Sequence, residues 1–391
     1  MQRRTPDAAR LGVFWFGVQA VWAALLGVSM QARSAQIAPG WELGAYALLA
    51  SSGAIAAGFT QIGAGFASDR LRTRAPFYAA GTLVASAAIF WFYTAASYAQ
   101  LFAAVLFVQI GMNLAVGPYQ AVIPDFVTDE RAGAASSWMA GLQSAGNAAG
   151  AIAASLVANA RAVAALLIAG LLITCAVTAT YTQGLKPPAL QPQDRLPANR
   201  AYVDLFLSRT LMYVGFYTLL GYVFFFMQEV LGKPAARSQT GYLLLIVTAA
   251  GAAGAALCAR AADRWDRRAL VSIGGGIFAA SIALLVTRQT WPGMALAAAL
   301  AGGGWGIFLT ADWALGCRFV PRAHAATALG VWNLALLLAQ VAAPTLATLA
   351  IGCLPGLQNN FAGRIAFVLS CVEVLGGVAW IWRLPGLPLP L

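Results

Sequence analysis

The chain has 391 residues, of which 60% are hydrophobic and 9% are charged. A soluble domain carries about 25% charged residues, so this chain lacks the polar side chains needed to cover a water-facing surface. The composition argues against a soluble enzyme, a disordered chain and a nucleic-acid-binding module. The net charge of +11 does not change this, because the basic residues fall in short breaks between long apolar runs, a pattern typical of membrane-protein loops.

Cysteine, histidine and lysine usage excludes several kinds of chemistry. The five cysteines form no CxxC pair and His324 is the single histidine, so the sequence offers no disulfide framework, zinc site or histidine-based dyad. Neither Lys186 nor Lys233 stands in a GxxxxGK[ST] context, so a phosphate-binding loop of the ATP-hydrolysing type is absent from the sequence. We expect no enzyme activity, no catalytic residue, no metal and no cofactor.

The first apolar run follows Arg3, Arg4 and Arg10, as in a secretory signal peptide. The run extends from Leu11 to about Met30, which is longer than the apolar core of a signal peptide, and many similar runs follow it. We therefore expect a retained first transmembrane helix.

Twelve apolar runs have about the length, roughly 20 residues, that a helix needs to cross a bilayer. They cover residues 11–30, 44–67, 75–94, 99–123, 135–157, 162–184, 202–230, 239–260, 269–287, 292–317, 326–349 and 363–383. A polar, proline-rich stretch at 185–200 separates two sets of six. We predict an all-α membrane protein with an N-terminal six-helix half (1–184), a linker (185–200) and a C-terminal six-helix half (201–391).

The distribution of basic residues predicts the orientation. Seventeen of the 24 Lys and Arg residues fall on the side of the N-terminus, six fall on the other side, and Arg209 lies within a run. Because cytoplasmic loops are enriched in Lys and Arg, we expect both termini and the linker in the cytoplasm. The lipid bilayer is then one partner, nucleic acid is not expected, and the sequence does not identify a protein partner.

Two landmarks repeat along the chain with nearly the same offset. The pair Asp69-Arg70 recurs as Asp263-Arg264, 194 residues later. The loop VTDERAG at 127–133 corresponds to VPRAHAA at 320–326, 193 residues later. Two tandem six-helix halves, related by an axis along the membrane normal, explain both offsets.

The loop after the second run carries Gly65, Asp69, Arg70 and Arg74 in the spacing GxxxDRxxxR. This loop resembles the motif of the major facilitator superfamily, as do the topology and the linker, over essentially the whole chain. The second copy keeps Asp263 and Arg264 but lacks the glycine. The resemblance implies a secondary transporter that works by alternating access.

The resemblance also implies a gating role for this loop. Asp69 would contact the N-terminus of the eleventh helix, where the backbone dipole favours a carboxylate. Arg70 would pair with Asp125 at the end of the fourth helix and hold the cytoplasmic side closed. Arg318 stands at the counterpart of Asp125, so the second loop cannot form the same pair. A simple positive-inside anchor is the alternative.

Three longer segments carry a finer resemblance. The segment at 117–150 is similar to the sucrose-transporter-like branch, whose members are mostly proton-coupled sugar symporters. The segments at 206–232 and 312–333 are similar to bacterial proteins near that branch. This implies a sugar or related solute, protons as the coupling ion and a bacterial inner membrane. In GNAAG (146–150), Asn147 replaces the proline of the antiporter motif of drug exporters, which argues against drug–proton antiport.

Three charged residues lie inside predicted spans: Arg209, Asp312 and Glu373. Such charges are costly in a membrane and usually face a cavity or a partner. The resemblance places the helices of Arg209 and Asp312 around the cavity, both roughly 8–9 Å deep, and we expect an ion pair that is either static or broken during transport. Glu373 lies on the peripheral twelfth helix. It is expected to be protonated and bonded to a neighbouring helix, with proton coupling as the alternative.

Uncharged polar residues cluster by helix phase and pair amides with aromatic rings. The candidate solute-binding residues are Gln19, Trp22, Gln109, Asn113, Gln143, Asn147, Tyr213, Tyr217, Asn333 and Gln340. Amides and aromatic faces suit a hydroxyl-rich solute, whereas hydrogen bonds between helices are the alternative. Gly141, Gly146, Gly150 and the run 302–306 predict close helix packing.

These patterns favour a secondary active transporter for a small polar solute, with a sugar as the leading class and protons as the coupling ion. Two alternatives remain. One is a proton-coupled exporter of amphipathic compounds, with Glu373 or Asp312 as proton carrier. The other is a non-transporting membrane assembly factor on the same fold.

Overall fold

The structure is a computed structural model that describes residues 8–126, 129–185, 200–261, 265–319, 325–353 and 358–384. Every regular element in these segments is a helix, as the long apolar runs predict. The chain divides into two compact units, Met1–Pro192 and Gln193–Leu391. Each unit holds six long helices in its described part.

The first unit opens with a span from Arg10 to Ile37 that contains one π-helical turn. Its pieces are α1 (Ala8–Gly12), α2 (Phe14–Ala24), η1 (Leu25–Ser29) and α3 (Met30–Ile37). The other helices are α4 (Glu42–Leu71), α5 (Ala75–Thr94), α6 (Tyr98–Tyr119), the short α7 (Val122–Phe126), α8 (Asp129–Leu156) and α9 (Ala160–Thr182).

The second unit consists of α10 (Arg200–Leu231), α11 (Lys233–Ala261), α12 (Arg267–Thr287), α13 (Trp291–Phe319), α14 (Ala325–Gly352) and α15 (Gln358–Ile381). Each of the twelve predicted runs coincides with one long helix of the two units, with ends that differ by a few residues.

Eleven of the described helices are long and apolar enough to cross a membrane. The helix α8 has the length of a span but is not one of the eleven, and its first turn carries Asp129, Glu130 and Arg131. The predicted run at 135–157 lies within α8 and beyond this charged turn.

Side-chain caps explain where several helices begin. Ser97 accepts a hydrogen bond from the backbone N–H of Gln100 at the start of α6, and Asn159 does the same for Arg161 at the start of α9. Asp266 caps α12 by accepting from the backbone N–H of Arg268. Each cap satisfies a backbone donor that has no partner inside its helix.

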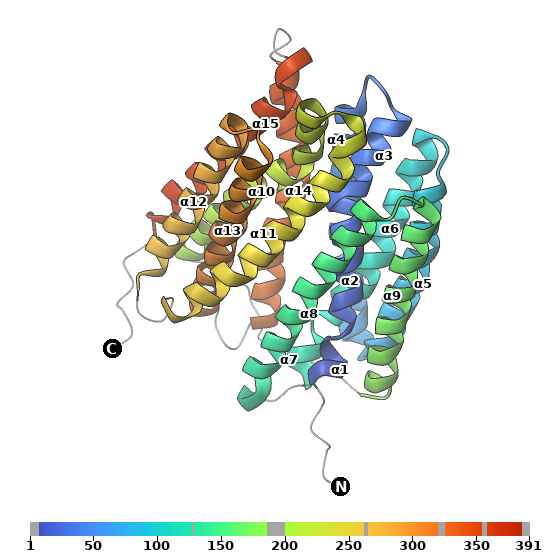
Figure 1. Cartoon of the computed structure of the whole chain (residues 1–391). Helices are drawn as coiled ribbons and strands as arrows, with labels where there is room; N and C mark the ends of the chain where they lie inside the picture. Colours follow the sequence, from blue (N-terminus) through green and yellow to red (C-terminus); the bar gives the residue numbers. More distant parts are fainter. Residues whose placement is uncertain are drawn as a thin grey trace. The chain divides into compact units, whose positions relative to one another are not determined.

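The same helix neighbours recur in both units (Figure 1). In the first unit α6 packs on α4 and α5, and α2 packs on α8 and α9. In the second unit α13 packs on α11 and α12, and α10 packs on α14 and α15. These are equivalent helices in a tandem repeat, so both units have one packing scheme.

Glycine contacts repeat with the same offset. A Cβ on Gly81 would lie 2.5 Å from the carbonyl oxygen of Gly111, where α5 crosses α6. A Cβ on Gly274 would lie 2.7 Å from the carbonyl oxygen of Gly304, where α12 crosses α13. Both glycines of the second crossing follow their counterparts by 193 residues. In each unit the two helices therefore cross so closely that a side chain does not fit between their backbones.

The packing prediction for the other glycines holds in part. Gly146 and Gly150 of α8 lie directly against backbone carbonyls of α2, and Gly302 and Gly306 of α13 lie against the backbone of α11. The prediction is wrong for Gly141 within the described part of the chain, because no heavy atom there lies within 4 Å of the place its Cβ would take.

Candidate functional site

The second unit contains a buried ion pair between Arg209 of α10 and Asp312 of α13. Nη1 of Arg209 contacts Oδ2 of Asp312, and the two side chains are only 5% and 2% exposed. The contact that the sequence led us to expect is therefore present. Because a membrane or protein interior solvates an isolated charge poorly, each residue compensates the charge of the other.

Two aromatic rings lie against the Arg209 guanidinium. Its Cζ atom lies 4.8 Å from the ring centroid of Tyr213 and 4.5 Å from that of Trp332 on α14. Nη2 donates a long hydrogen bond of 3.4 Å to the hydroxyl of Tyr213, whereas Nε is buried and has no hydrogen-bond partner among the described residues. The rings thus restrict the orientation of the guanidinium. Part of its capacity to donate hydrogen bonds is not used by the described residues.

An aromatic wall continues from Tyr213 along α10. Tyr213 stacks on Tyr217 at 6.3 Å and meets Trp305 of α13 edge-on at 5.1 Å. Trp305 also stacks on Phe216 at 4.1 Å. The hydroxyl of Tyr217 accepts a hydrogen bond of 2.9 Å from the amide of Gln340 on α14. Three of the predicted solute-binding residues therefore form one connected group, which also includes the ion pair.

The predicted amides of the first unit form two separate pairs. Nε2 of Gln19 on α2 donates to Oε1 of Gln143 on α8 at 3.4 Å. On α6, Nδ2 of Asn113 donates to the backbone carbonyl of Gln109 at 2.9 Å and to its side-chain oxygen at 3.2 Å. The pair of Gln19 and Gln143 joins two helices, as the alternative of hydrogen bonds between helices expects, whereas the pair of Gln109 and Asn113 lies within α6. The described contacts do not join one pair to the other.

The remaining predicted solute-binding residues are half-buried. Trp22 lies on α2, Asn147 on α8 and Asn333 on α14. Asn333 takes part in an interaction within the described part of the chain. Their role as solute contacts stays a prediction.

Glu373 of α15 contacts the neighbouring helix α10. Its Oε2 accepts a hydrogen bond of 2.9 Å from the hydroxyl of Thr218, while Oε1 is buried and has no partner in the described segments, and the side chain is 7% exposed. Next to it, the hydroxyl of Ser370 donates to the carbonyl of Gly215 at 2.6 Å. The contact with a neighbouring helix matches the structural expectation for Glu373.

The gating-loop motif of the first unit is organised by Arg74 and not by Arg70. Nε and Nη2 of Arg74 lie 3.0 and 2.9 Å from Oδ2 of Asp125, and Nη1 pairs with Asp69. Arg74 is 6% exposed, whereas Arg70 is exposed. The expected pair between Arg70 and Asp125 is therefore wrong for this structure. Arg70 belongs to the last turn of α4, ahead of the bend that brings Arg74 inward.

Ser68 holds this bend, and the sequence patterns did not point to it. The backbone of Arg72 is left-handed, with φ at 51°, and ends α4. The hydroxyl of Ser68 donates to the carbonyl of Thr73 at 2.6 Å and accepts from Nη1 of Arg74 at 2.9 Å. A serine one position before the Asp-Arg pair, close to the end of a helix, was the available signal.

The carboxyl of Asp125 lies in a mostly buried environment. Burial raises its pKa above the ordinary value, and the positive charge and hydrogen bonds of Arg74 oppose this shift. Gly65, the first residue of the motif, has no heavy atom within 4 Å of the place where a Cβ would stand. The contact between Asp69 and the eleventh helix stays a prediction.

The corresponding loop of the second unit is held differently. Asp263 and Arg264 lie outside the described residues. Nη1 of Arg267 donates to the backbone carbonyl of Ala314 on α13 at 2.9 Å. The equivalent arginine of the first unit, Arg74, pairs with the side chain of Asp125 instead. Arg268 pairs with Asp266 at 2.7 Å, and its hydrogen bond lowers the pKa of the Asp266 carboxyl.

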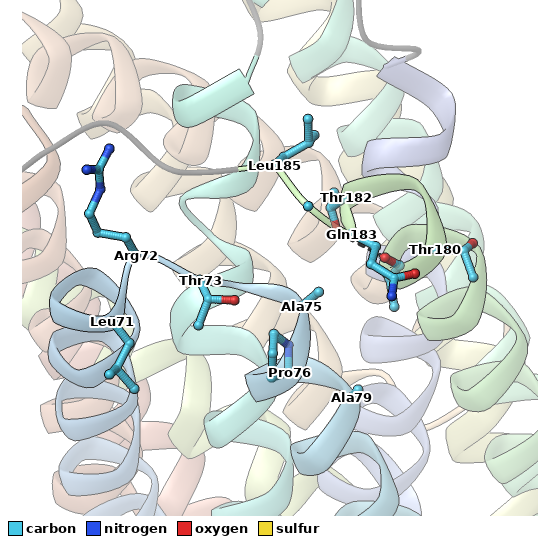
Figure 2. A pocket seen from close by; sticks show the side chains of 12 residues that line it. Leu71, Arg72, Thr73, Ala75, Pro76, Ala79, Thr180, Thr182, Gln183 and Leu185 are labelled. Atoms are coloured by element: carbon cyan, nitrogen blue, oxygen red, sulfur yellow. Dashed lines mark hydrogen bonds between the residues drawn. The ribbon is translucent and has the colours of Figure 1, made fainter.

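A surface pocket lies beside the first loop, between the α4–α5 connection and the end of α9 (Figure 2). Its walls include Arg72, Thr73 and Pro76 on one side and Thr182 and Gln183 on the other. None of the predicted solute-binding residues is among the residues that line it. This pocket belongs to the loop region and is not the predicted solute site.

A sequence profile supplies the family. The profile of the Major Facilitator Superfamily matches residues 11–344. The chain belongs to the major facilitator superfamily. It is accordingly a multi-pass membrane transporter and not an enzyme, and the family resemblance of its loop motif is confirmed. No curated protein matches the chain in sequence.

Solved structures of other transporters have the same fold at low sequence identity. A D-xylose-proton symporter superposes with a TM-score of 0.73 at 14% identity, covering 98% of this chain and 97% of the other. The nucleoside transporter NupG gives 0.70 at 14%, covering 96% and 100%. A bacterial homologue of the human lysosomal transporter Spinster gives 0.67 at 14%, covering 96% and 94%. These similarities establish the fold and leave the sucrose-transporter-like branch unconfirmed.

Proposed function

We propose that this major facilitator protein is a proton-coupled symporter that takes up a small polar solute of the sugar class by alternating access. The observation that carries the proposal is the buried pair between Arg209 and Asp312, which lies beside the wall formed by Tyr213, Tyr217 and Gln340. A charged group and a polar, ring-lined surface thus belong to one site.

Asp312 is the proton carrier in this proposal. Its carboxylate is ionised while it pairs with Arg209, and protonation removes the charge that holds the pair together. The pair joins α10 to α13, so its loss releases one contact between these two helices. Proton binding is thereby linked to a change in helix packing.

The neighbouring wall supplies the groups that a hydroxylated solute needs. Tyr213, Tyr217 and Trp305 offer ring faces, and Gln340 offers both a donor and an acceptor. The sugar class is supported further by the fold similarity to a D-xylose-proton symporter, which is an argument by analogy.

Uptake into proteoliposomes tests the proposal. We expect labelled D-xylose, D-glucose or a related sugar to accumulate faster with an inward proton gradient than without one. Asp312→Asn should lose this stimulation and retain exchange of solute across the membrane, because the site keeps its shape but cannot carry the proton. Asp204→Asn is the matched control, since Asp204 accepts from Trp380 on α15 and an asparagine oxygen can replace it.

Two results would contradict the proposal. One is gradient-stimulated uptake that survives in the double variant Arg209→Gln/Asp312→Asn, which would show that the pair is not needed for coupling. The other is the absence of proton-stimulated uptake for every solute of the panel in the wild-type protein.

We further propose that the chain lies in a bacterial inner membrane with both termini in the cytoplasm. Cys353, which is exposed after α14, would then face away from the cytoplasm. A membrane-impermeant maleimide added to intact cells should label the wild-type protein and not Cys353→Ser. Labelling of Cys353 only after the cells are opened would contradict the orientation.

A further inference from the structure

The guanidinium of Arg209 has donors that the described residues do not use. Nη1 pairs with Asp312, Nη2 makes a long contact of 3.4 Å with Tyr213, and Nε is buried without a partner in the described part of the chain. A buried donor without an acceptor costs free energy, so such groups usually mark a place for a water, an ion or a ligand. The Arg209 side chain is more than nine-tenths buried, so water does not supply the acceptor that its Nε–H group lacks among the described residues.

The rings around Arg209 decide where that acceptor can bind. Tyr213 and Trp332 lie against the guanidinium and Asp312 takes Nη1, so the edge formed by Nε and Nη2 is the part without a strong acceptor among the described residues. The edge of a fixed guanidinium presents paired N–H groups that match the two oxygens of a carboxylate. A single neutral hydroxyl would satisfy this edge less completely.

Charge compensation points to the same ligand. Asp312 is the ion-pair partner of Arg209 among the described residues. Among the described residues, Tyr202, Tyr213 and Tyr217 of α10 also act electrostatically on Arg209, while Arg267 of α12 reaches the backbone two residues beyond Asp312. None of these groups can replace the negative charge when Asp312 is protonated, so an arriving anion would restore neutrality.

We propose that the solute carries a carboxylate, as a sugar acid does, and that this carboxylate replaces Asp312 on Arg209. This inference rests on the proposed proton symport. Asp312 takes up one proton on its carboxyl oxygen and its ion pair with Nη1 is lost, while the solute carboxylate accepts hydrogen bonds from Nε and Nη2, the two N–H groups that share one edge of the guanidinium. One proton and one monoanion then move together, and no net charge enters or leaves with them.

The first experiment tests the anion site without knowledge of the natural solute. Asp312→Asn and Asp312→Ala each leave Arg209 without its counter-ion, so both should melt at a lower temperature than the wild type. Added sodium acetate should raise the melting temperature of either variant in a saturable way, because acetate binds the folded state. The control Arg209→Gln/Asp312→Asn, which has no cation at this place, should not respond, and sodium chloride at equal ionic strength should not replace acetate. If only one single variant folds, it suffices for the comparison.

The second experiment measures transport of a matched pair of probes, D-glucuronate and D-glucose. D-glucuronate uptake should be stimulated by an inward proton gradient and unaffected by an interior-negative potential, because the cotransported charges cancel. It should be lost in Arg209→Gln, and Arg209→Lys should restore it only partly, because lysine lacks the planar fork.

The outcomes separate this inference from the proposed function. Acetate that fails to stabilise the Asp312 variants, or stabilises the double variant equally, overturns the anion site. Proton-stimulated D-glucose uptake that the interior-negative potential accelerates overturns it as well and leaves the proton symport standing. Acetate rescue without proton-stimulated uptake of either probe supports the anion site and counts against the proposed symport.

Discussion

Arg74 and Asp125 form a largely buried ion pair in which Nε and Nη2 of the arginine lie 3.0 and 2.9 Å from one carboxylate oxygen. The pair ties the start of α5 to α7, and Nη1 of the same arginine holds Asp69 at the end of α4. Three helix ends of the first unit are thus joined through one guanidinium. The loop motif has a structural role within its own unit, in addition to any role in gating.

Arg74→Gln should strongly destabilise the protein. Removing one partner of a buried pair leaves an uncompensated charge and costs about 3–5 kcal/mol. Arg70→Gln is the matched control, because Arg70 belongs to the same loop and its side chain is exposed. Denaturant unfolding in detergent would measure both, and an equal loss for the two variants would show that Arg74 is not the central residue.

Alanine at two glycines of α12 should have opposite effects. A Cβ at Gly274 would lie 2.7 Å from the carbonyl oxygen of Gly304, so Gly274→Ala forces α12 and α13 apart and should cost about 1–3 kcal/mol. Gly276 has open space at this place. Gly276→Ala should therefore stabilise the helix by up to about 1 kcal/mol, because alanine has the higher helix propensity. Thermal unfolding of the two variants checks the sign, and destabilisation by both would reject the close-crossing argument.

The same substitution at Gly81 tests the internal repeat. Gly81 precedes Gly274 by 193 residues, and a Cβ at this position would lie 2.5 Å from the backbone of α6. Gly81→Ala should cause a loss of stability similar to that of Gly274→Ala. A neutral result at Gly81 would show that the two units do not share this packing requirement.

Glu373→Gln should retain both stability and proton-stimulated transport. A glutamine oxygen can accept the hydrogen bond of Thr218 as the glutamate oxygen does. Thr218→Val, which removes the donor, should cost about 1 kcal/mol, since a buried hydrogen bond is lost. Parallel measurements of unfolding and uptake distinguish the roles: loss of proton stimulation in Glu373→Gln would identify Glu373 as a coupling residue.

Asp266 should contribute a stability that depends on pH. The hydrogen bond from Arg268 lowers the pKa of its carboxyl below the value of about 3.9 in an unfolded chain. The ionised form is therefore favoured by folding, and its contribution is present above about pH 4 and is lost as the pH falls through the lowered pKa. Asp266→Asn keeps a cap but not the charge.

The two Asp266 variants separate the cap from the charge. Asp266→Ala should cost about 0.5–2 kcal/mol at neutral pH, because the N-terminus of α12 loses its cap. Asp266→Asn should differ from the wild type at neutral pH and converge with it in acid. A difference that is constant between neutral pH and about pH 3 would show that the charge of Asp266 does not contribute.

The sequence predicted the pairing of Arg209 with Asp312 because two opposite charges in apolar helices at similar depth have few other partners. It did not predict Trp332 over the guanidinium or the bond from Gln340 to Tyr217, which depend on the rotation of α14 against α10. An apolar helix with polar residues on several faces does not reveal which face meets a neighbour.

The sequence alone determined the helix lengths and the offset between the two units. The thickness of a bilayer sets the length of each apolar run, and a tandem repeat places the same motif at a constant spacing. Only the tertiary structure decided that Arg74 and not Arg70 meets Asp125, and that Gly146 and Gly150 but not Gly141 contact α2. Arg70 and Arg74 have the same chemistry and lie on the two sides of one bend. The left-handed turn at Arg72, held by Ser68, directs the second arginine inward, and this geometry results from the packing of α4, α5 and α7.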